Sequence, residues 1–368
     1  MHRFKKHWWG MISSVILIAF TGYMLMDTFL LTKVYVVAND KKENKSDNDT
    51  ENEQQEAVST GTTYSDDNIQ ITLTEYREND TTVYVADVVL SSPEYLQTAF
   101  AQSSYRRNVT EKTSEMAQDA GAILAINGDY YGAQEKGYVI RDGVLYRDTA
   151  KTDQQDLVIY EDGTMKIISE DEVTAEELLE EGAKEVLSFG PALITDGEIA
   201  VTESDEVGKA MASNPRTAIG MIDDLHYVFV VSDGRTEESE GLSLLELAEF
   251  MDSLGVKTAY NLDGGGSTTF VAKEEGADEL SVVNRPSDGY ARSVSSSLMV
   301  VSTAKPSNEF DHAIVSADYD YLTVGTSLPI TVTGVSASGN AAQLPEGTTI
   351  QVSDSLVGSV SGDTFTAS

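Results

Sequence analysis

The sequence predicts an α+β fold, with a large mixed β-sheet domain and several helices in the middle of the chain. Apolar runs of strand length are numerous, and helical periodicity is confined to a few short stretches. Strands and helices do not alternate regularly, as a parallel α/β sheet would require. With 368 residues, of which 40% are apolar, the chain has room for about two domains and a substantial core.

Charge and cysteine content exclude several kinds of partner and site. The formal net charge is -36, so the phosphate backbone of a nucleic acid would be repelled. The chain contains no cysteine, which excludes disulfides, thiolate metal sites and a cysteine nucleophile. We therefore expect no nucleic-acid partner, and an acidic surface suited to the outside of a cell.

The N-terminus predicts a membrane anchor. Three basic side chains lie in residues 1–7, and residues 8–26 carry no charge. Because this span is long enough to cross the hydrocarbon core as a helix, we assign residues 8–31 to a transmembrane signal anchor. The basic flank predicts that residues 1–7 are cytoplasmic and that the rest lies outside, on a bacterial, Gram-positive-like cell membrane. A cleaved signal peptide is the alternative, although no convincing small-x-small cleavage site follows the span.

Two segments flank the α+β domain, which we expect at residues 68–303. Residues 32–67 are acidic and nearly free of apolar residues, so they predict a disordered linker. After residue 303 the composition shifts to Val, Thr, Ser and Gly in short alternating runs. Residues 304–368 therefore resemble a partial bacterial immunoglobulin-like β domain, shorter than a full sandwich.

Local patterns predict the elements of the central domain. Strands or hairpins are expected where runs alternate or are fully apolar, at residues 69–76, 82–90, 122–126, 138–146, 157–168, 226–231, 258–262 and 297–302. Helices are expected where caps or a broad apolar face support them, at residues 113–120, 174–181 and 242–254. A short helix is also expected to open at Ser92-Pro93.

Polar turns follow three of the predicted strands. They are Asn127-Gly-Asp129, Asp233-Gly-Arg235 and Asn261-Leu-Asp-Gly-Gly-Gly-Ser-Thr268. Three consecutive glycines bring no side chain to pack, but they let backbone N–H groups approach an anion or a sugar closely. A flexible hairpin turn is the simple alternative. If the three strand ends gather at one edge, they build a cleft on rigid elements.

Five motifs in this order resemble the phosphodiester glycosidase family. They are Ala125-Ile-Asn-Gly-Asp-Tyr-Tyr131, Asn214-Pro-Arg-Thr-Ala-Ile-Gly220, Asp233-Gly-Arg235, Asn261 to Thr268, and Arg285-Pro…Arg292. The resemblance covers residues 68–303 and implies hydrolysis of a sugar-1-phosphodiester at the anomeric carbon. Bacterial members of this family are associated with exopolysaccharide.

The residue types suit that chemistry. An oxocarbenium-like anomeric centre needs a carboxylate as nucleophile, base or acid, and the catalytic candidates are Asp129, Asp233 and Asp263. Guanidinium groups and backbone donors stabilise a leaving phosphate, whereas amides and hydroxyls hold a sugar. The substrate-binding candidates are Asn127, Arg216, Arg235, Asn261, Gly264, Gly265, Gly266, Ser267, Thr268, Arg285 and Arg292. The alternative for each Asp is a turn residue beside Gly, and for Arg216 a surface ion pair.

Two functions fit these features. The first is a membrane-anchored extracellular glycosidase that hydrolyses sugar-1-phosphodiester bonds in cell-envelope or exopolysaccharide glycans. The second is a non-catalytic glycan-binding or surface-assembly protein that keeps the same pocket. The sequence requires no cofactor; a divalent cation beside the aspartates stays open, because no ligand spacing specifies one.

Overall fold

The computed structural model describes residues 57–202, 213–319 and 321–368. This part of the chain is mostly β-sheet with few helices, which is α+β in character. Its strand pairs are all antiparallel, so the expectation of a mixed sheet is wrong for the described residues. Antiparallel neighbours need only short hairpins, whereas parallel pairs need long crossovers.

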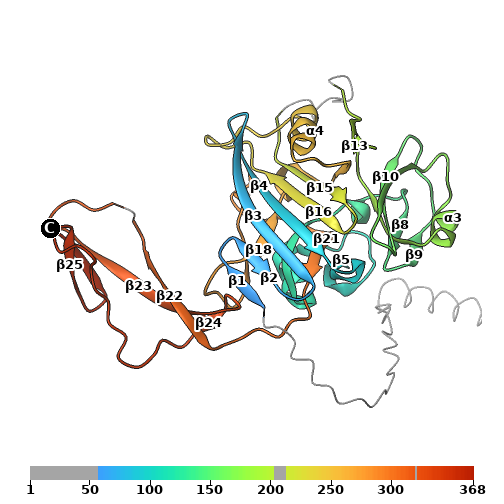
Figure 1. Cartoon of the computed structure of the whole chain (residues 1–368). Helices are drawn as coiled ribbons and strands as arrows, with labels where there is room; N and C mark the ends of the chain where they lie inside the picture. Colours follow the sequence, from blue (N-terminus) through green and yellow to red (C-terminus); the bar gives the residue numbers. More distant parts are fainter. Residues whose placement is uncertain (1–56, 203–212, 320) are drawn as a thin grey trace, which may run out of the picture. The chain divides into compact units, whose positions relative to one another are not determined.

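The largest sheet has nine strands (Figure 1). In spatial order they are β1 (Val58–Thr60), β2 (Thr63–Ser65), β3 (Ile69–Glu78), β4 (Thr81–Leu90), β16 (His226–Ser232), β15 (Arg216–Asp223), β17 (Thr258–Asn261), β13 (Ala192–Thr195) and β14 (Glu198–Ile199). Strands β1 and β2 lie within the stretch that the sequence predicts as a linker. They join the sheet because β2 pairs with β3, with Thr63 opposite Thr72.

A second sheet packs against one face of the first. Its strands are β19 (Leu280–Val282), β18 (Phe270–Lys273), β7 (Ala122–Asn127), β21 (Ser296–Val301) and β5 (Leu96–Phe100). On β16, Phe229 and Val231 enter the core between the sheets, together with Phe270 and Leu298 of the second sheet. The intervening Val230 faces the opposite side, so both faces of β16 are buried. This explains its continuous apolar run.

Two helices cover the outer faces of these sheets. Helix α4 (Leu244–Ser253) packs on the nine-stranded sheet, and α2 (Thr113–Ala120) packs on the second sheet. Ser243 caps α4 and Gly121 ends α2 in a left-handed conformation, with φ of 69°. The predicted bounds of α2 are confirmed. The result is a layered core of helix, sheet, sheet and helix.

A third sheet forms beside this core from the two predicted hairpins and one more strand. Its strands are β11 (Met165–Ser169), β10 (Gln155–Tyr160), β12 (Ala183–Ser188), β8 (Val139–Arg141) and β9 (Val144–Arg147), with α3 (Ala175–Glu180) packed on it. Short elements complete the domain: η1 (Pro93–Tyr95), η2 (Ala101–Ser103), η3 (Tyr131–Ala133), η5 (Gly265–Ser267), β6 (Glu111–Lys112) and β20 (Ser293–Val294). The helix expected at Pro93 is only the single turn η1, because the chain enters β5 at Leu96 to pair with β21.

The C-terminal segment forms an antiparallel sheet of its own. It contains β22 (Phe310–Ala317), β23 (Ser327–Ser336), β24 (Ala341–Ala342), β25 (Gly358–Ser361) and β26 (Thr364–Ala367). An immunoglobulin-like sandwich stays a prediction. The cytoplasmic tail and the anchor, predicted at residues 1–31, lie outside the described residues, as does most of the linker. Among the helices that the structure does describe, none has the length and apolar character needed to cross a membrane.

Candidate active site

The ends of strands from both large sheets meet at one place. Asn127, the last residue of β7, donates from Nδ2 to the backbone oxygen of Asp263 at 2.6 Å. Its Oδ1 accepts from the Thr217 hydroxyl of β15 at 2.8 Å and from the Thr269 N–H at 3.0 Å. The Asp263 N–H also donates to the Gly128 oxygen at 3.3 Å. Asn127 therefore joins the two sheets, and its amide is occupied in holding the glycine turn.

Each glycine of the Gly264–Gly266 turn is required for a different reason. A Cβ on Gly264 would lie 2.9 Å from the backbone oxygen of Pro215, which is too close. Gly265 has φ of 62°, a left-handed conformation that favours glycine, and it lies against the Arg235 guanidinium. A Cβ on Gly266 would overlap the guanidinium of Arg292. Gly265 and Gly266 thus let two cationic side chains approach one turn, whereas Gly264 lets the turn approach the backbone at Pro215.

Asp263 precedes this turn and is partly exposed to solvent. Burial raises the pKa of its carboxyl group to about 6, while hydrogen bonds from the Ser267 hydroxyl and the Gly264 N–H and the charge of Arg292 oppose the rise. The negative charge of Asp129 adds to the rise. A carboxyl group with this pKa changes its protonation state near neutral pH, as an acid–base catalyst must.

Asp233 follows β16 and is more enclosed, with 2% of its surface exposed. One oxygen, Oδ1, accepts from the Arg285 N–H at 2.9 Å and from Nδ2 of Asn284 at 3.2 Å. The Tyr84 hydroxyl approaches Oδ2 at 3.5 Å. Burial raises the pKa of Asp233, although these donors partly offset the effect. Asp233 links β16 to the loop that carries Arg285.

Asp129 is a buried structural carboxylate in this structure, with 1% of its surface exposed. Its Oδ2 forms an ion pair with Arg141 at 2.8 Å and accepts from the Ser188 N–H at 3.1 Å. Its Oδ1 accepts from the Ser296 hydroxyl at 2.8 Å. Both oxygens are therefore occupied by protein donors. Asp129 holds together the segments that carry Arg141, Ser188 and Ser296.

The four arginines differ in how they are held. Arg235, Arg285 and Arg292 have exposed side chains, each with a polar partner: Asn214 for Arg235, Glu238 for Arg285 and Asp288 for Arg292. Arg216 is buried on β15 and donates from Nε to the Leu242 oxygen at 2.8 Å. The structure therefore places Arg235 and Arg292 at the glycine turn, with Arg285 in the loop held by Asp233.

Two buried polar atoms near the turn lack a protein partner among the described residues. They are Oδ1 of Asn261, whose Nδ2 donates to the Gly190 oxygen at 2.8 Å, and the hydroxyl of Thr268. An unpaired buried polar atom costs about 1–3 kcal/mol, so it needs an explanation. A buried water molecule would satisfy either atom.

Some residues that shape the site were not among the candidates. Asn284 bonds both Asp233 and the Thr268 oxygen, and Asn214 holds Arg235. The available signal was their position: Asn214 opens one of the five motifs, and Asn284 directly precedes another. Nothing in the sequence marked Arg141 as a residue of the site, because it lies in a hairpin strand outside the five motifs. The described residues contain no group of three or more His, Asp or Glu that can hold a metal ion.

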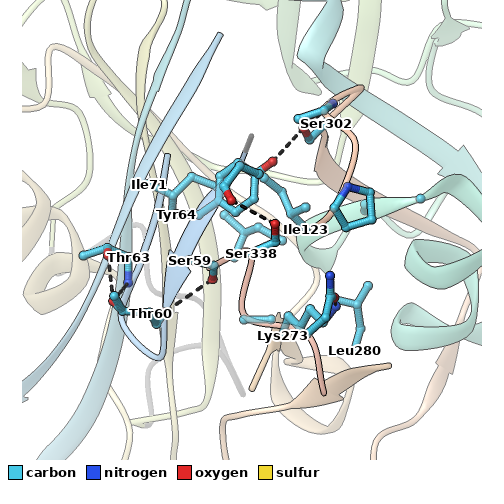
Figure 2. Close-up of a pocket in the computed structure, with 18 of the residues that line it drawn as sticks. Ser59, Thr60, Thr63, Tyr64, Ile71, Ile123, Lys273, Leu280, Ser302 and Ser338 are labelled. Carbon is cyan, nitrogen blue, oxygen red and sulfur yellow. Dashed lines mark hydrogen bonds between the residues drawn. The ribbon is translucent and has the colours of Figure 1, made fainter. Parts of the chain in front are cut away.

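A cavity of about 310 Å³ lies elsewhere in the molecule (Figure 2). Its walls include Tyr64, Ile71, Ile123 and Leu280, and the Tyr64 hydroxyl donates to Ser302 at 2.7 Å. None of the predicted site residues lines it. About half of its lining residues are apolar, and the polar ones include Lys273 and Asp278 but no arginine.

Comparison with known proteins assigns the family. Residues 120–301 match the family model described as phosphodiester glycosidase, and this stretch contains every candidate site residue. These residues form a phosphodiester glycosidase domain. The family consists of hydrolases.

Known relatives of this glycosidase domain come from bacteria and animals. The SPbeta prophage-derived uncharacterized protein YomE of Bacillus subtilis is 31% identical over 204 residues, which cover 54% of this chain and 31% of YomE. The mouse N-acetylglucosamine-1-phosphodiester alpha-N-acetylglucosaminidase is 33% identical over 183 residues, 45% of this chain and 34% of the mouse protein. The chain thus spans about a third of the length of these curated relatives.

A solved structure shares the fold of the domain. It is the catalytic domain of zebrafish N-acetylglucosamine-1-phosphodiester alpha-N-acetylglucosaminidase, auto-inhibited by its pro-peptide. The TM-score is 0.51 at 22% identity, over 64% of this chain and 83% of the zebrafish chain. At this identity the similarity concerns the fold.

Proposed function

We propose that the protein is a membrane-anchored extracellular glycosidase that hydrolyses sugar-1-phosphodiester bonds in cell-envelope or exopolysaccharide glycans. The observation that carries this proposal is the arrangement at the glycine turn. There, the charge of Arg292 acts on the partly exposed carboxyl group of Asp263, and the guanidinium of Arg235 lies against Gly265 of the same turn. The mouse relative, whose name specifies an N-acetylglucosamine-1-phosphodiester, supports the substrate class.

The arginines suit an anionic substrate. In a chain with a formal net charge of -36, a phosphodiester is repelled over most of the surface, so local cations must hold it. Arg235 supplies a guanidinium group at Gly265, and Arg292 supplies one at Gly266. Guanidinium groups and backbone N–H groups form strong charge-assisted hydrogen bonds to phosphate oxygens. They stabilise the phosphate monoester that leaves when the bond at the anomeric carbon breaks.

Asp263 is the carboxylate best placed to act on the substrate. The reaction forms a bond between the anomeric carbon and a water oxygen, breaks the bond from that carbon to the phosphate oxygen, and releases one proton from the water. Asp263 can accept that proton, or attack the carbon first and be released by water. Asp233 and Asp129 have oxygens already occupied by protein donors, so they fix the surrounding loops.

The extracellular location follows from the sequence. Arg3, Lys5 and Lys6 precede the uncharged span at residues 8–26, an order that keeps the N-terminus in the cytoplasm. A reporter fused after Val58 should be active outside the cytoplasm. Activity confined to the cytoplasm would contradict this orientation.

Release of free sugar from an α-sugar-1-phosphodiester tests the reaction. Wild type should turn the diester over, and Asp263→Asn, which keeps the shape but removes the charge, should lower turnover at least about a hundredfold. Thermal melts confirm that the variant is folded, and Asp278→Asn, which changes a residue that lines the separate cavity, is the matched control. Binding without turnover by wild type would favour the non-catalytic glycan-binding function instead.

A further inference from the structure

The cavity in Figure 2 lies at one edge of the two large sheets, away from the glycine turn. Its walls come from β2 and β3 of the nine-stranded sheet and from β7, β18 and β19 of the second sheet. The C-terminal segment completes it with Ala304, Pro306, Ser338 and Asn340. Exposed residues such as Gln118 and Asp278 also line it, so the cavity is reached from the surface.

Aliphatic side chains form one part of the lining. They are Ile71, Leu73, Ile123, Leu124 and Leu280. Leu73, Ile123 and Leu280 are only half-buried, although each packs against one of the apolar clusters of the domain. An alkyl chain in the cavity would remove this apolar surface from water, which is favourable.

Lys273 brings a positive charge to the same lining (Figure 2). In the described part of the chain its Nζ donates to Oδ1 of Asn340, an uncharged amide whose Nδ2 donates in turn to the Ser307 oxygen at 3.2 Å. Burial lowers the pKa of Lys273, and the exposed Asp278 opposes this effect through its charge. Because an ammonium group has three N–H donors, Lys273 has donors to spare for an anion.

We propose that this cavity binds a straight-chain aliphatic carboxylate of about eight carbons, with its carboxylate on Lys273 and its chain among the aliphatic residues. At about 30 Å³ for each water-sized group, a volume of 310 Å³ holds about ten non-hydrogen atoms, the number in octanoate. The carboxylate accepts charge-assisted hydrogen bonds from the ammonium group, which an alcohol does more weakly and an amine cannot do. The proposal does not depend on the proposed hydrolysis, because none of the predicted site residues lines the cavity.

Residue-specific labelling of the full chain tests where the ligand binds. Octanoate should slow the acylation of Lys273 by an amine-reactive reagent, read by mass spectrometry, because it covers the amine and favours its charged, unreactive form. The half-protecting concentration measures affinity, which should tighten about fourfold for each CH₂ added between butanoate and octanoate. Dodecanoate, whose chain exceeds the cavity, should gain nothing further. Lys166, exposed on β11 outside the cavity, is the internal control and should be labelled at a constant rate.

Two variants separate the charge from the space. Octanoate should raise the melting temperature of wild type, and melts titrated with ligand give its affinity. Lys273→Met, which keeps a chain of similar length without the charge, should bind octanoate at least about tenfold more weakly, whereas Lys166→Met should bind it as wild type does. Octan-1-ol should bind wild type and Lys273→Met equally. Ile123→Trp, which fills the cavity, should remove the protection of Lys273.

Several results would overturn the proposal. Equal protection of Lys166 and Lys273, or an affinity that keeps rising at the same rate to dodecanoate, would indicate adsorption to the surface. Unchanged octanoate binding by Lys273→Met, or wild-type binding of octan-1-ol as tight as that of octanoate, would refute recognition of the carboxylate. If Ile123→Trp does not fold, the chain-length series and Lys273→Met decide the question.

Discussion

The three candidate carboxylates differ mainly in what surrounds their oxygens. Asp129 is saturated by an arginine, a backbone N–H and a hydroxyl, and Asp233 is held by Asn284 and the Arg285 N–H. Asp263 is the most open of the three, since it is partly exposed beside the glycine turn. We therefore propose Asp263 for the chemistry at the anomeric carbon, and Asp129 and Asp233 as positioning groups.

The raised pKa of Asp263 predicts the pH dependence of activity. The leaving phosphate needs no proton, whereas the attacking water must lose one, so the charged carboxylate is the active form. We expect kcat/KM to rise with pH through about 6, where Asp263 ionises. Initial rates between pH 4.5 and 8 measure this limb, and residual activity of Asp263→Asn should lack it. A profile that falls as pH rises through that value would indicate a general acid.

The same shift predicts an effect on stability. Burial raises the pKa of Asp263 in the folded state above its pKa in the unfolded chain. The protonated group therefore contributes fully to stability at pH values below the unfolded-state pKa, and this contribution is lost as the pH rises through about 6. Asp263→Asn should therefore melt higher than wild type at pH 7, and the difference should shrink towards pH 4. Thermal melts across this range check the sign. A variant that melts lower at pH 7 would show that the charged form is favoured by its hydrogen bonds.

Replacing Asp129 should have the opposite effect on stability from replacing Asp263. Its side chain is fully buried and is paired with Arg141, whose side chain is 5% exposed, so removing one charge strands the other. We expect Asp129→Asn and Arg141→Gln each to lower the free energy of unfolding by about 3–5 kcal/mol, and the double variant to lose less than the sum. Denaturant titrations measure this. A stable Asp129→Asn protein with abolished turnover would instead show a direct catalytic role.

At the scale of elements, helix caps and hairpin turns could be predicted because their signals lie within a few residues. The bounds of α2 and the Thr174 capping box, with a Glu three residues on, are examples. Strand direction could not be read locally, so the sheets were expected to be mixed. For the site, the sequence predicted which strands end in polar turns, but not how the residues of those turns contact one another. Asn127 and Asp263 are 136 residues apart, and neither motif shows that the Asn127 amide is occupied by the turn.

The cap of α4 provides a test at this scale. The Ser243 hydroxyl accepts from the Glu246 N–H at 3.1 Å, and the Glu246 carboxylate accepts from the Ser243 N–H at 2.8 Å. Since α4 covers the face of the nine-stranded sheet opposite the second sheet, we expect Ser243→Ala to cost about 1 kcal/mol of stability and leave KM unchanged. Thr174→Ala, at the equivalent cap of α3, is the control. A changed KM in Ser243→Ala alone would couple α4 to the site.

For the whole molecule, the main question is which parts of the chain the glycosidase domain needs. The C-terminal segment contacts it through several hydrogen bonds, including Ser59 N–H to the Ala337 oxygen at 2.8 Å and Gly276 N–H to the Gly339 oxygen at 2.9 Å. These bonds reach β1 and the turn after β18, and none of them involves a residue of the five motifs. The apolar clusters between and outside the two large sheets contain residues from Ile69 to Val300 and none from the C-terminal segment. The core is therefore complete without that segment.

We accordingly expect residues 57–304 to fold alone with the activity of the full chain. Residues 68–303 should also fold, but they should melt about 3–10 °C lower, because they lack β1 and β2. Tyr64 of β2 packs on the core and bonds Asp66 and Ser302, so Tyr64→Ala in the longer fragment should reproduce part of that loss. Calorimetry and sugar release on both fragments measure these effects. If residues 57–304 unfold without cooperativity while the full chain unfolds in one transition, the C-terminal segment completes the domain after all.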